Sequence, residues 1–252
     1  MKRLQALFVI VTLGTLAFAA CAPSSNGGRG GDPAGGKLPG AQVTGKGNGG
    51  NPLKMSQEDI KAKIMTMKPA LLNVFTGLKS LADSETLVPG MTDLNGKKDL
   101  IDLINLMTEK AANKVFEDIQ TAANFNIQEG ACVDSASQSN AATAIPGEIG
   151  GKICFSLDSL QEVSPKDADD AVNILLLAIA AHEFGHHYLT GDKMADEALV
   201  QKLQDFVSKQ LHKYEAAGTN TISIGALSFA DKFRAEAETL FEQAQIAQTL
   251  HN

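Results

Sequence analysis

The stretch that most constrains the fold covers residues 172–187. Residues 172–181 are apolar at nearly every position, and the six residues that follow, His182 to His187, read HEFGHH. A helix that is hydrophobic on all sides has to lie inside a domain. Polar side chains at the end of such a helix are costly to bury unless they find partners. The sequence therefore predicts a central helix whose His and Glu side chains have a specific binding partner.

Two histidines in this stretch have the spacing of a metal site. His182 and His186 are four residues apart, so both imidazoles project from one face of the helix. Two imidazoles placed in this way can bind one Zn²⁺ ion, and Glu183 lies beside the first of them, where it can accept a proton from the attacking water. The spacing predicts a zinc site with a general base next to it.

At these residues the chain resembles the zincin metallopeptidases, the HEXXH zinc proteases. The resemblance covers His182 to His186 and the flanking helix, and it does not extend to the N-terminal half of the chain. It implies that His182 and His186 bind the metal and that Glu183 is the catalytic base and acid in peptide-bond hydrolysis. It also implies a strand edge above the helix that holds an extended peptide, for which residues 143–157 are the candidate.

The third metal ligand is not set by this motif alone. In the metzincin subgroup a Gly follows the second His by three residues and a His or Asp follows it by six; here these places hold Leu189 and Asp192. In the gluzincin subgroup the third ligand is a Glu from the following helix, and here Asp196 and Glu197 lie in the first turn of that predicted helix. The missing Gly makes the gluzincin arrangement the better match.

The geometry of a helical hairpin favours Glu197 among these carboxylates. Residues equidistant from the turn of a tight hairpin face each other, and counting outward from residues 191–192 brings Glu197 opposite His186. We therefore expect Glu197 to be the third ligand. The alternatives are Asp196 and Asp192, and more remotely Glu236 and Glu238 of the last helix.

Four further polar residues are weaker candidates for the site. His187 lies about 100° around the helix from His186, so it either supports the site from behind or faces solvent. Tyr188, His212 and Tyr214 could each hydrogen-bond the oxyanion that forms when a peptide bond is hydrolysed. Each of these three residues also fits a purely structural role.

Helical patterns begin at the start of the folded domain, which we place at residues 54–252. Ser56 and Asp59 resemble a capping box at the start of a helix. Pro69 has to kink or interrupt this helix because it removes a backbone donor. A second helical piece then extends to about Ala82, as the spacing of its leucines indicates.

The later part of the domain contains four more predicted helices. An apolar stripe predicts one long helix over residues 97–123. Ser164 followed by a proline predicts the start of the central helix, which ends near Thr190. Two further helices are predicted over residues 193–214 and from Ser228 to the C-terminus.

A small β region lies between these helices. Residues 152–157 have the pattern of a strand. Cys132 and Cys154 are 22 residues apart and are the only cysteines after Cys21. In an exported chain two such cysteines predict a disulfide, with two free buried thiols as the alternative. The absence of a CxxC pair argues against a metal role for them. The predicted fold is α+β, predominantly helical and zincin-like, with a small β region stapled by this disulfide.

The N-terminus has the pattern of an export signal. Lys2 and Arg3 precede an uncharged apolar run, which is typical of a secretory signal peptide over residues 1–20. The run ends in Phe-Ala-Ala before Cys21, similar to the lipobox of bacterial lipoproteins. We therefore expect Cys21 to be lipidated, with cleavage by the ordinary signal peptidase as the alternative.

The residues after Cys21 predict a tether between a membrane and the folded domain. Residues 21–53 contain eleven glycines between Gly27 and Gly50 and almost no large apolar side chain. Such a segment cannot offset its chain entropy by burial, so it behaves as a flexible linker. Together with Cys21 it predicts a lipid-anchored protein of the bacterial cell envelope, at the outer membrane or the periplasmic face.

Composition narrows the function further. The chain has 29 acidic and 22 basic residues, so it offers no basic stripe for nucleic acid. We therefore expect an exported zinc-dependent metalloendopeptidase that acts on a peptide or protein substrate. A non-catalytic cell-envelope binding lipoprotein with a degenerate zincin scaffold is the alternative. A third possibility is an envelope assembly protein whose helices bind a partner.

Overall fold

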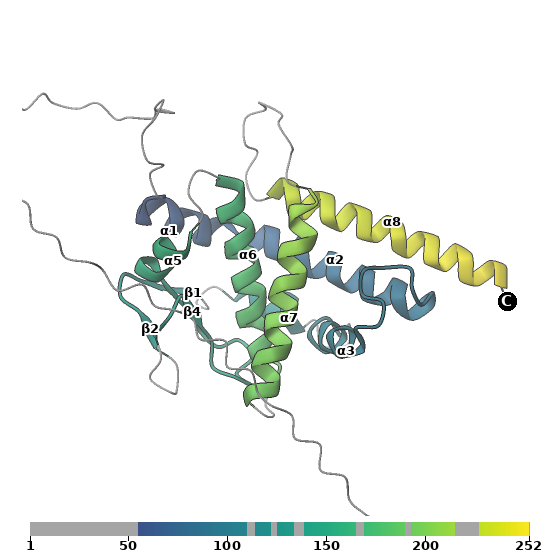
Figure 1. Cartoon of the computed structure of the whole chain (residues 1–252), viewed down its shortest axis with the longest axis horizontal. Coiled ribbons are helices and arrows are strands. Elements are labelled where there is room, and N and C mark those ends of the chain that lie inside the picture. The colour runs from purple at the N-terminus through teal and green to yellow at the C-terminus, as the bar shows by residue number, and fades with distance from the viewer. Residues whose placement is uncertain are drawn as a thin grey trace, which may run out of the picture. The chain divides into compact units, whose positions relative to one another are not determined.

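The computed structural model describes most of the predicted folded domain (Figure 1). The predicted signal peptide, Cys21 and the tether lie outside the described residues, so the structure does not bear on them. The described residues are 55–109, 114–121, 125–133, 139–164, 169–189, 193–214 and 227–251.

Helices form most of this part of the chain, and the strands are short. The helices are α1 (Gln57–Thr66), α2 (Lys68–Leu87), α3 (Lys98–Met107), α4 (Lys114–Gln120), α5 (Leu157–Val163), α6 (Asp169–His186), α7 (Lys193–His212) and α8 (Leu227–His251). The strands are β1 (Phe125–Gln128), β2 (Cys132–Val133), β3 (Ser139–Asn140), β4 (Ala142–Thr143) and β5 (Ile153–Ser156). The prediction of a mainly helical α+β fold is confirmed.

The first two helices begin as the sequence predicts. The Ser56 hydroxyl oxygen accepts a hydrogen bond from the Asp59 backbone N–H and caps α1. Pro69 lies in the first turn of α2. Backbone N–H groups in a first turn have no acceptor within the helix, so a proline there removes no helical hydrogen bond. The helix nevertheless continues past Ala82 to Leu87.

The extra turn of α2 is stabilised by a buried glutamate that the apolar pattern did not reveal. The Glu85 carboxylate accepts hydrogen bonds from the N–H groups of Gly90 and Thr92, at 2.6 and 3.0 Å. Each buried carboxylate oxygen therefore has a donor, which offsets the cost of its burial. The backbone turn after α2 is held against the helix as a result.

The prediction of one long helix over residues 97–123 is wrong. The helix α3 ends at Met107, and Thr108 has non-helical backbone angles, with φ at −101° and ψ at 12°. The Thr108 hydroxyl donates to the Ile104 carbonyl at 2.7 Å, and its backbone N–H bonds to the same oxygen. Thr108 is thus the C-cap of α3, where the helical backbone conformation ends. The apolar stripe misled the prediction because Val115 of α4 is buried as well.

The β region forms two small sheets. In the larger sheet β5 lies between β1, to which it is parallel, and β4, to which it is antiparallel. The smaller sheet pairs β2 with β3. The strand predicted over residues 152–157 is thus confirmed as Ile153–Ser156, at the centre of the larger sheet.

A short helix that the sequence analysis missed follows β5 directly. The Ser156 hydroxyl accepts from the Ser159 N–H and caps α5. Ser164, which we expected to open the central helix, instead closes α5, and its hydroxyl donates to the Leu160 carbonyl at 2.5 Å. Residues 165–168, where the central helix was expected to start, lie outside the described residues.

The predicted disulfide is present. It joins Cys132 of β2 to Cys154 of β5, with a Cα–Cα distance of 5.9 Å. The bond therefore ties the two small sheets together, and the alternative of two free thiols is wrong. Because β4 pairs with β5, the disulfide also holds β4, which contacts the central helix α6.

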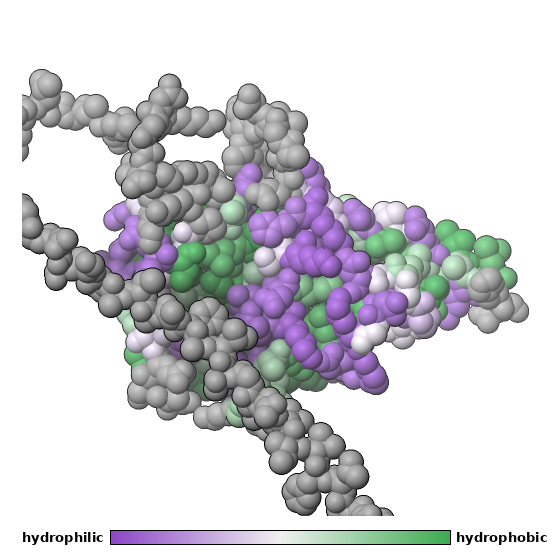
Figure 2. Space-filling view, in the orientation of Figure 1, coloured by the Kyte–Doolittle hydropathy of each residue, from purple (hydrophilic) through white to green (hydrophobic). Residues whose placement is uncertain are grey.

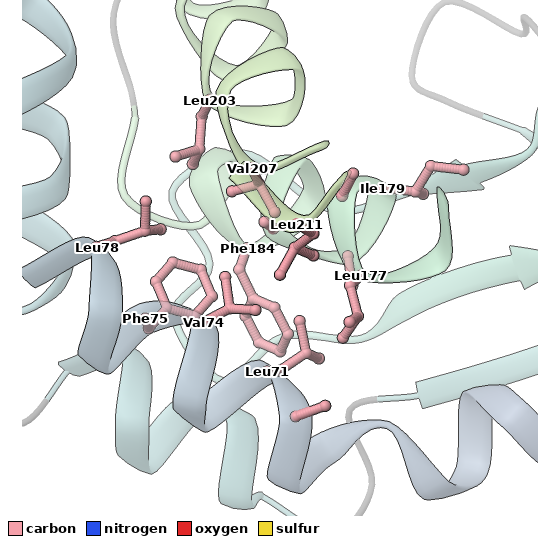
Figure 3. Packing of buried hydrophobic residues seen from close by; sticks show 14 of the residues in the cluster. Leu71, Val74, Phe75, Leu78, Leu177, Ile179, Phe184, Leu203, Val207 and Leu211 are labelled. Carbon is pink, nitrogen blue, oxygen red and sulfur yellow. The ribbon is translucent and has the colours of Figure 1, made fainter. Parts of the chain in front are cut away.

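The helix α6 lies at the centre of the domain, as its composition predicts. Figure 1 shows α6 beside α7, with α2 crossing α6. In Figure 3, Phe184 of α6 points toward Leu71 and Phe75 of α2, and the Phe75 and Phe184 rings meet edge to face at 6.3 Å. The HEFGHH sequence therefore contributes a buried aromatic side chain, Phe184, to the hydrophobic core. Among the helices that the structure describes, none has the length and apolar character needed to span a membrane.

We predict that removing the disulfide lowers stability without abolishing the helices. Replacing Cys132 and Cys154 by Ala frees a loop of 22 residues in the unfolded chain, which lowers the free energy of unfolding by about 3 kcal/mol in the chain-entropy model. Urea denaturation followed by circular dichroism measures this loss. Cys21→Ala is the matched control and should leave the midpoint unchanged; an equal midpoint for the double variant would contradict the prediction.

Candidate metal centre

Three side chains converge where α6 ends and α7 begins. The Nε2 atoms of His182 and His186 are 3.1 Å apart. Glu197 places one carboxylate oxygen 3.6 Å from the His182 Nε2 and the other 3.3 Å from the His186 Nε2. These three residues form a group that could hold a metal ion. The structure thus brings together the three residues that we predicted as ligands.

The spacing of the three donors fits a tetrahedral ion. Ligand atoms bound at about 2.0–2.1 Å in tetrahedral geometry lie roughly 3.3 Å from one another. The observed separations of 3.1, 3.3 and 3.6 Å lie near this value, with the two distances to Glu197 ending on different carboxylate oxygens. Without an ion, the same 3.1 Å separation fits an N–H···N hydrogen bond between the two neutral imidazoles, whose direction depends on their tautomers. An ion between them would satisfy both nitrogens and the carboxylate.

A close approach between α6 and α7 brings Glu197 to the histidines. The approach occurs at Gly185, between the two predicted ligands of α6. A Cβ atom at Gly185 would lie 2.7 Å from the Cγ1 atom of Val200, which is too close for a real contact. Glu197 precedes Val200 by three residues and so lies one turn along the same side of α7. The glycine therefore allows the helix spacing that the site needs.

The site is closed on the side of α6 and open on the side of α7. His182 is 8% exposed, whereas the Glu197 side chain is 59% exposed. An ion held by these residues would be anchored on a buried helix and reachable through the carboxylate side. A water molecule or a substrate would therefore reach such an ion from the side of Glu197.

Glu183 lies beside this group in a buried position. The residue is 6% exposed, and its carboxyl accepts a hydrogen bond from the Ala144 backbone N–H. Burial raises the pKa of Glu183 to about 8; the bond from Ala144 acts against this rise, and the negative charge of Glu197 adds to it. A carboxyl whose pKa lies near neutrality can both accept and return a proton.

Burial favours the uncharged form of both histidines, which is the form that binds a metal. Burial, together with the charge of His186, lowers the pKa of His182 to about 4. Burial also lowers the pKa of His186, although the carboxylates of Glu197 and Asp196 act in the opposite direction. Protons therefore compete with a metal ion for these nitrogens only in acid.

Residues 144–150, which connect β4 toward β5, lie along the end of α6. We refer to them as the 144–150 segment. Three of its backbone N–H groups donate hydrogen bonds, two to residues at the end of α6 and one to Asp118. Ala144 bonds to the Glu183 carboxyl, Gly147 donates to the His186 carbonyl at 2.9 Å, and Gly150 donates to Asp118 at 3.0 Å. The region that we expected to lie above the active-site helix does lie next to it.

Asp118 of α4 hydrogen-bonds the two residues that directly follow the ligands of α6. The sequence analysis missed it. Its carboxylate bonds to the Nδ1 of His187 at 2.7 Å and accepts from the Tyr188 hydroxyl at 3.3 Å. The side chains of Asp118 and His187 are both fully buried. The alternative that His187 faces solvent is therefore wrong. A usable signal existed, because Asp118 follows Val115 by three residues and so lies on the buried face of α4.

The candidates at the far end of α7 and on α8 lie away from the three ligands. His212 is 15 residues beyond Glu197 on α7, about 22 Å along the helix, and Tyr214 follows it. Glu236 bonds to Tyr214 at that far end, and Glu238 pairs with Arg234 on α8. Asp192 lies outside the described residues. Tyr188 uses its hydroxyl on Asp118 and so has a structural role.

Comparisons of the chain with protein-family models, with curated proteins and with solved structures gave no match. Functional conclusions therefore depend on the residues of the site and on their geometry.

We predict that Gly185→Ala separates α7 from α6. Overpacking at a contact of 2.7 Å costs about 1–3 kcal/mol, against a helix-propensity gain of about 1 kcal/mol. Both the urea midpoint and the affinity for zinc should fall, because Glu197 moves away with Val200. The control is Gly130→Ala, where a Cβ atom meets nothing within 4 Å. Unchanged zinc affinity in Gly185→Ala would show that the spacing of α6 and α7 does not govern the site.

We predict that single-residue changes separate the ligands from their neighbours. His186→Ala and Glu197→Ala should each weaken zinc binding by more than about a hundredfold, since even residues that only orient ligands contribute ten- to hundredfold. Asp196→Ala should retain the metal within a few-fold. A competitive titration with a chromophoric chelator measures all three affinities. Loss of zinc in Asp196→Ala but not in Glu197→Ala would reassign the third ligand.

Proposed function

We propose that the chain is a zinc-dependent metallopeptidase of the zincin type, with a gluzincin-like ligand set. The observation that carries this proposal is the group of His182, His186 and Glu197 donors at tetrahedral spacing, with Glu183 beside it. Two imidazoles and one carboxylate, with a fourth position open, are the ligand set of many catalytic zinc sites. A structural zinc site would instead be closed by a fourth protein ligand.

In this proposal, His182, His186 and Glu197 would bind the metal ion, and Glu183 would transfer the protons. A bound zinc ion would supply Lewis acidity, polarising the scissile carbonyl and making the attacking water more acidic. Glu183 would take the proton from that water and return it to the leaving amine. Its pKa of about 8 in the metal-free site would fall beside a divalent cation, so the carboxylate form would prevail at neutral pH.

The strand β4 gives the proposed substrate a place to bind. In the part of the chain that the structure describes, β4 has a ladder with β5 alone, and the proposal assigns the extended peptide to its other edge, near β2. Ala144, directly after β4, contacts the proposed base. A peptide added along this edge would therefore cross the open side of the zinc site.

The proposed location comes from the sequence. Residues 1–20 would direct export, and Cys21 would carry the lipid anchor on the bacterial cell envelope. The glycine-rich residues 21–53 would hold the peptidase domain away from the membrane surface. The substrate would then be a peptide or protein exposed in the envelope, at the outer membrane or the periplasmic face.

A binding lipoprotein that keeps the zincin scaffold without catalysis is the alternative, and one observation favours it. Zincin hydrolysis needs a donor for the oxyanion. Of the candidates that we named, Tyr188 is bonded to Asp118, and His212 and Tyr214 lie at the other end of α7. Under this alternative the protein binds zinc and peptide but does not cleave the peptide.

We predict that Glu183→Gln separates catalysis from metal binding. The amide resembles the carboxyl in shape but cannot accept a proton at neutral pH, so hydrolysis of a quenched fluorescent peptide library should fall by at least about a hundredfold. Zinc content, measured by atomic absorption, should stay near one per chain. Glu242→Gln on the exposed part of α8 is the matched control and should keep full activity.

The outcomes of this experiment divide the two proposals. Full hydrolysis by zinc-loaded Glu183→Gln would refute the proposed mechanism while leaving the metal site intact. Zinc binding with no hydrolysis by the unmodified chain would refute the peptidase and favour the binding lipoprotein.

A further inference from the structure

A carboxylate is buried among the elements that carry the metal centre. Figure 2 shows polar side chains gathered at the surface, over α7. The side chains of Asp118 and His187 are instead fully buried. A buried carboxylate is costly unless its oxygens accept hydrogen bonds. The groups that donate to Asp118 are therefore held firmly where they meet it.

One oxygen of Asp118 holds the residues that follow α6. Its Oδ2 lies 2.7 Å from the Nδ1 of His187 and accepts from the Tyr188 hydroxyl at 3.3 Å. Both residues directly follow the proposed ligand His186, and they form a tight turn in which the His187 N–H bonds to the Phe184 carbonyl. This oxygen therefore fixes the backbone at the point where the chain leaves the ligand helix.

The other oxygen of Asp118 holds the 144–150 segment. Its Oδ1 accepts the N–H of Gly150 at 3.0 Å. Gly150 has a φ of 78°, which residues with a side chain rarely adopt. The turn at this glycine is closed by a hydrogen bond from the Gly151 N–H to the Glu148 carbonyl, at 2.9 Å. The end of the segment is thus a defined turn attached to α4.

The segment connects this contact to the ligand helix and to the proposed base. A second turn precedes the first, with Gly147 at a φ of 76°. Gly147 donates to the His186 carbonyl at 2.9 Å. Ala144, at the start of the segment, donates to the Glu183 carboxyl. Because hydrogen bonds close both turns, a displacement at Gly150 is carried along the segment to these contacts.

We propose that Asp118 is a positioning residue of the metal centre, which orients Glu183 through the 144–150 segment and His186 through the end of α6. The proposal deepens the peptidase function and rests on it for the role of Glu183. A misplacement of about 1 Å can cost a reaction about a hundredfold in rate. Groups that orient metal ligands contribute about ten- to hundredfold to metal affinity. Loss of the Asp118 carboxylate should therefore change both catalysis and zinc binding.

The test compares Asp118→Ala with Glu85→Ala. Glu85 is the matched control, because it is also a buried carboxylate that accepts from three donors, but it lies at the end of α2. Both variants should lose stability in urea. Chelator competition on chains that circular dichroism shows to be folded should give about tenfold weaker zinc binding in Asp118→Ala alone. For the zinc-loaded chains, kcat should fall at least about tenfold in Asp118→Ala, with KM within about twofold.

The zinc affinity distinguishes positioning from a purely structural role. A loss of global stability does not change the affinity of a chain that remains folded, since only a shift toward the unfolded state would lower it. A structural role would thus lower the urea midpoint of Asp118→Ala and leave its zinc affinity and kcat unchanged.

A second pair of variants keeps the buried carboxylate. Gly150 and Gly96 have φ angles of 78° and 73°, and a Cβ atom at either would meet nothing within 4 Å. Alanine therefore strains the two turns to a similar degree, but of these two glycines only Gly150 is bonded to Asp118. Gly150→Ala should weaken zinc binding and lower kcat several-fold, and Gly96→Ala should leave both unchanged.

The outcomes separate this proposal from the peptidase function. Unchanged zinc affinity in folded Asp118→Ala, or an equal loss in Glu85→Ala, overturns the proposal. If Asp118→Ala does not fold, the glycine pair decides, and equal behaviour of Gly150→Ala and Gly96→Ala overturns it. If the unmodified chain binds zinc but hydrolyses no peptide, the peptidase is refuted and the orientation of Glu183 for catalysis falls with it. The same zinc comparisons then still support or overturn the orientation of His186.

Discussion

The contact between Gly185 and Val200 is the interaction on which the site depends, because it sets the distance between α6 and α7. The two histidines lie on a helix whose other sides are buried, so they cannot move to meet a ligand. The third donor has to come to them, and it does so only if α7 approaches closely enough for Glu197 to reach both nitrogens. A side chain larger than hydrogen between the two ligands of α6 would prevent this approach. The convergence of these three side chains is in this sense a consequence of helix packing.

Burial of α6 also explains the polar residues that surround the site. A buried polar group needs a partner, and two residues at the end of this helix find one in neighbouring segments. Glu183 takes the N–H of Ala144, and His187 takes the carboxylate of Asp118. These bonds hold α4 and the 144–150 segment against the end of the helix. The strand edge, the proposed base and the ligands are thereby kept in one arrangement, as catalysis by fixed groups requires.

Much of this arrangement could be predicted because it follows from local periodicity. The four-residue spacing of the histidines and the hairpin count that selected Glu197 depend only on helix geometry, and both agree with the structure. The boundary after Met107 could not be predicted from the apolar stripe, since α3 and α4 each bury an apolar face. Asp118 was missed because its partner, His187, is 69 residues away in the sequence. Periodicity shows which face of a helix is buried, but not which distant side chain it meets.

The central claim is that His182, His186 and Glu197 bind one zinc ion and leave a position open. X-ray absorption spectroscopy at the zinc edge, on the full chain loaded with one equivalent of zinc, tests it most directly. The account predicts a first shell of nitrogen and oxygen atoms at about 2.0–2.1 Å, with the multiple scattering of two imidazoles and no sulfur. Replacing Glu197 by Ala should change this shell while the two imidazoles remain. A shell of six oxygens, or one without imidazole scattering, would contradict the account.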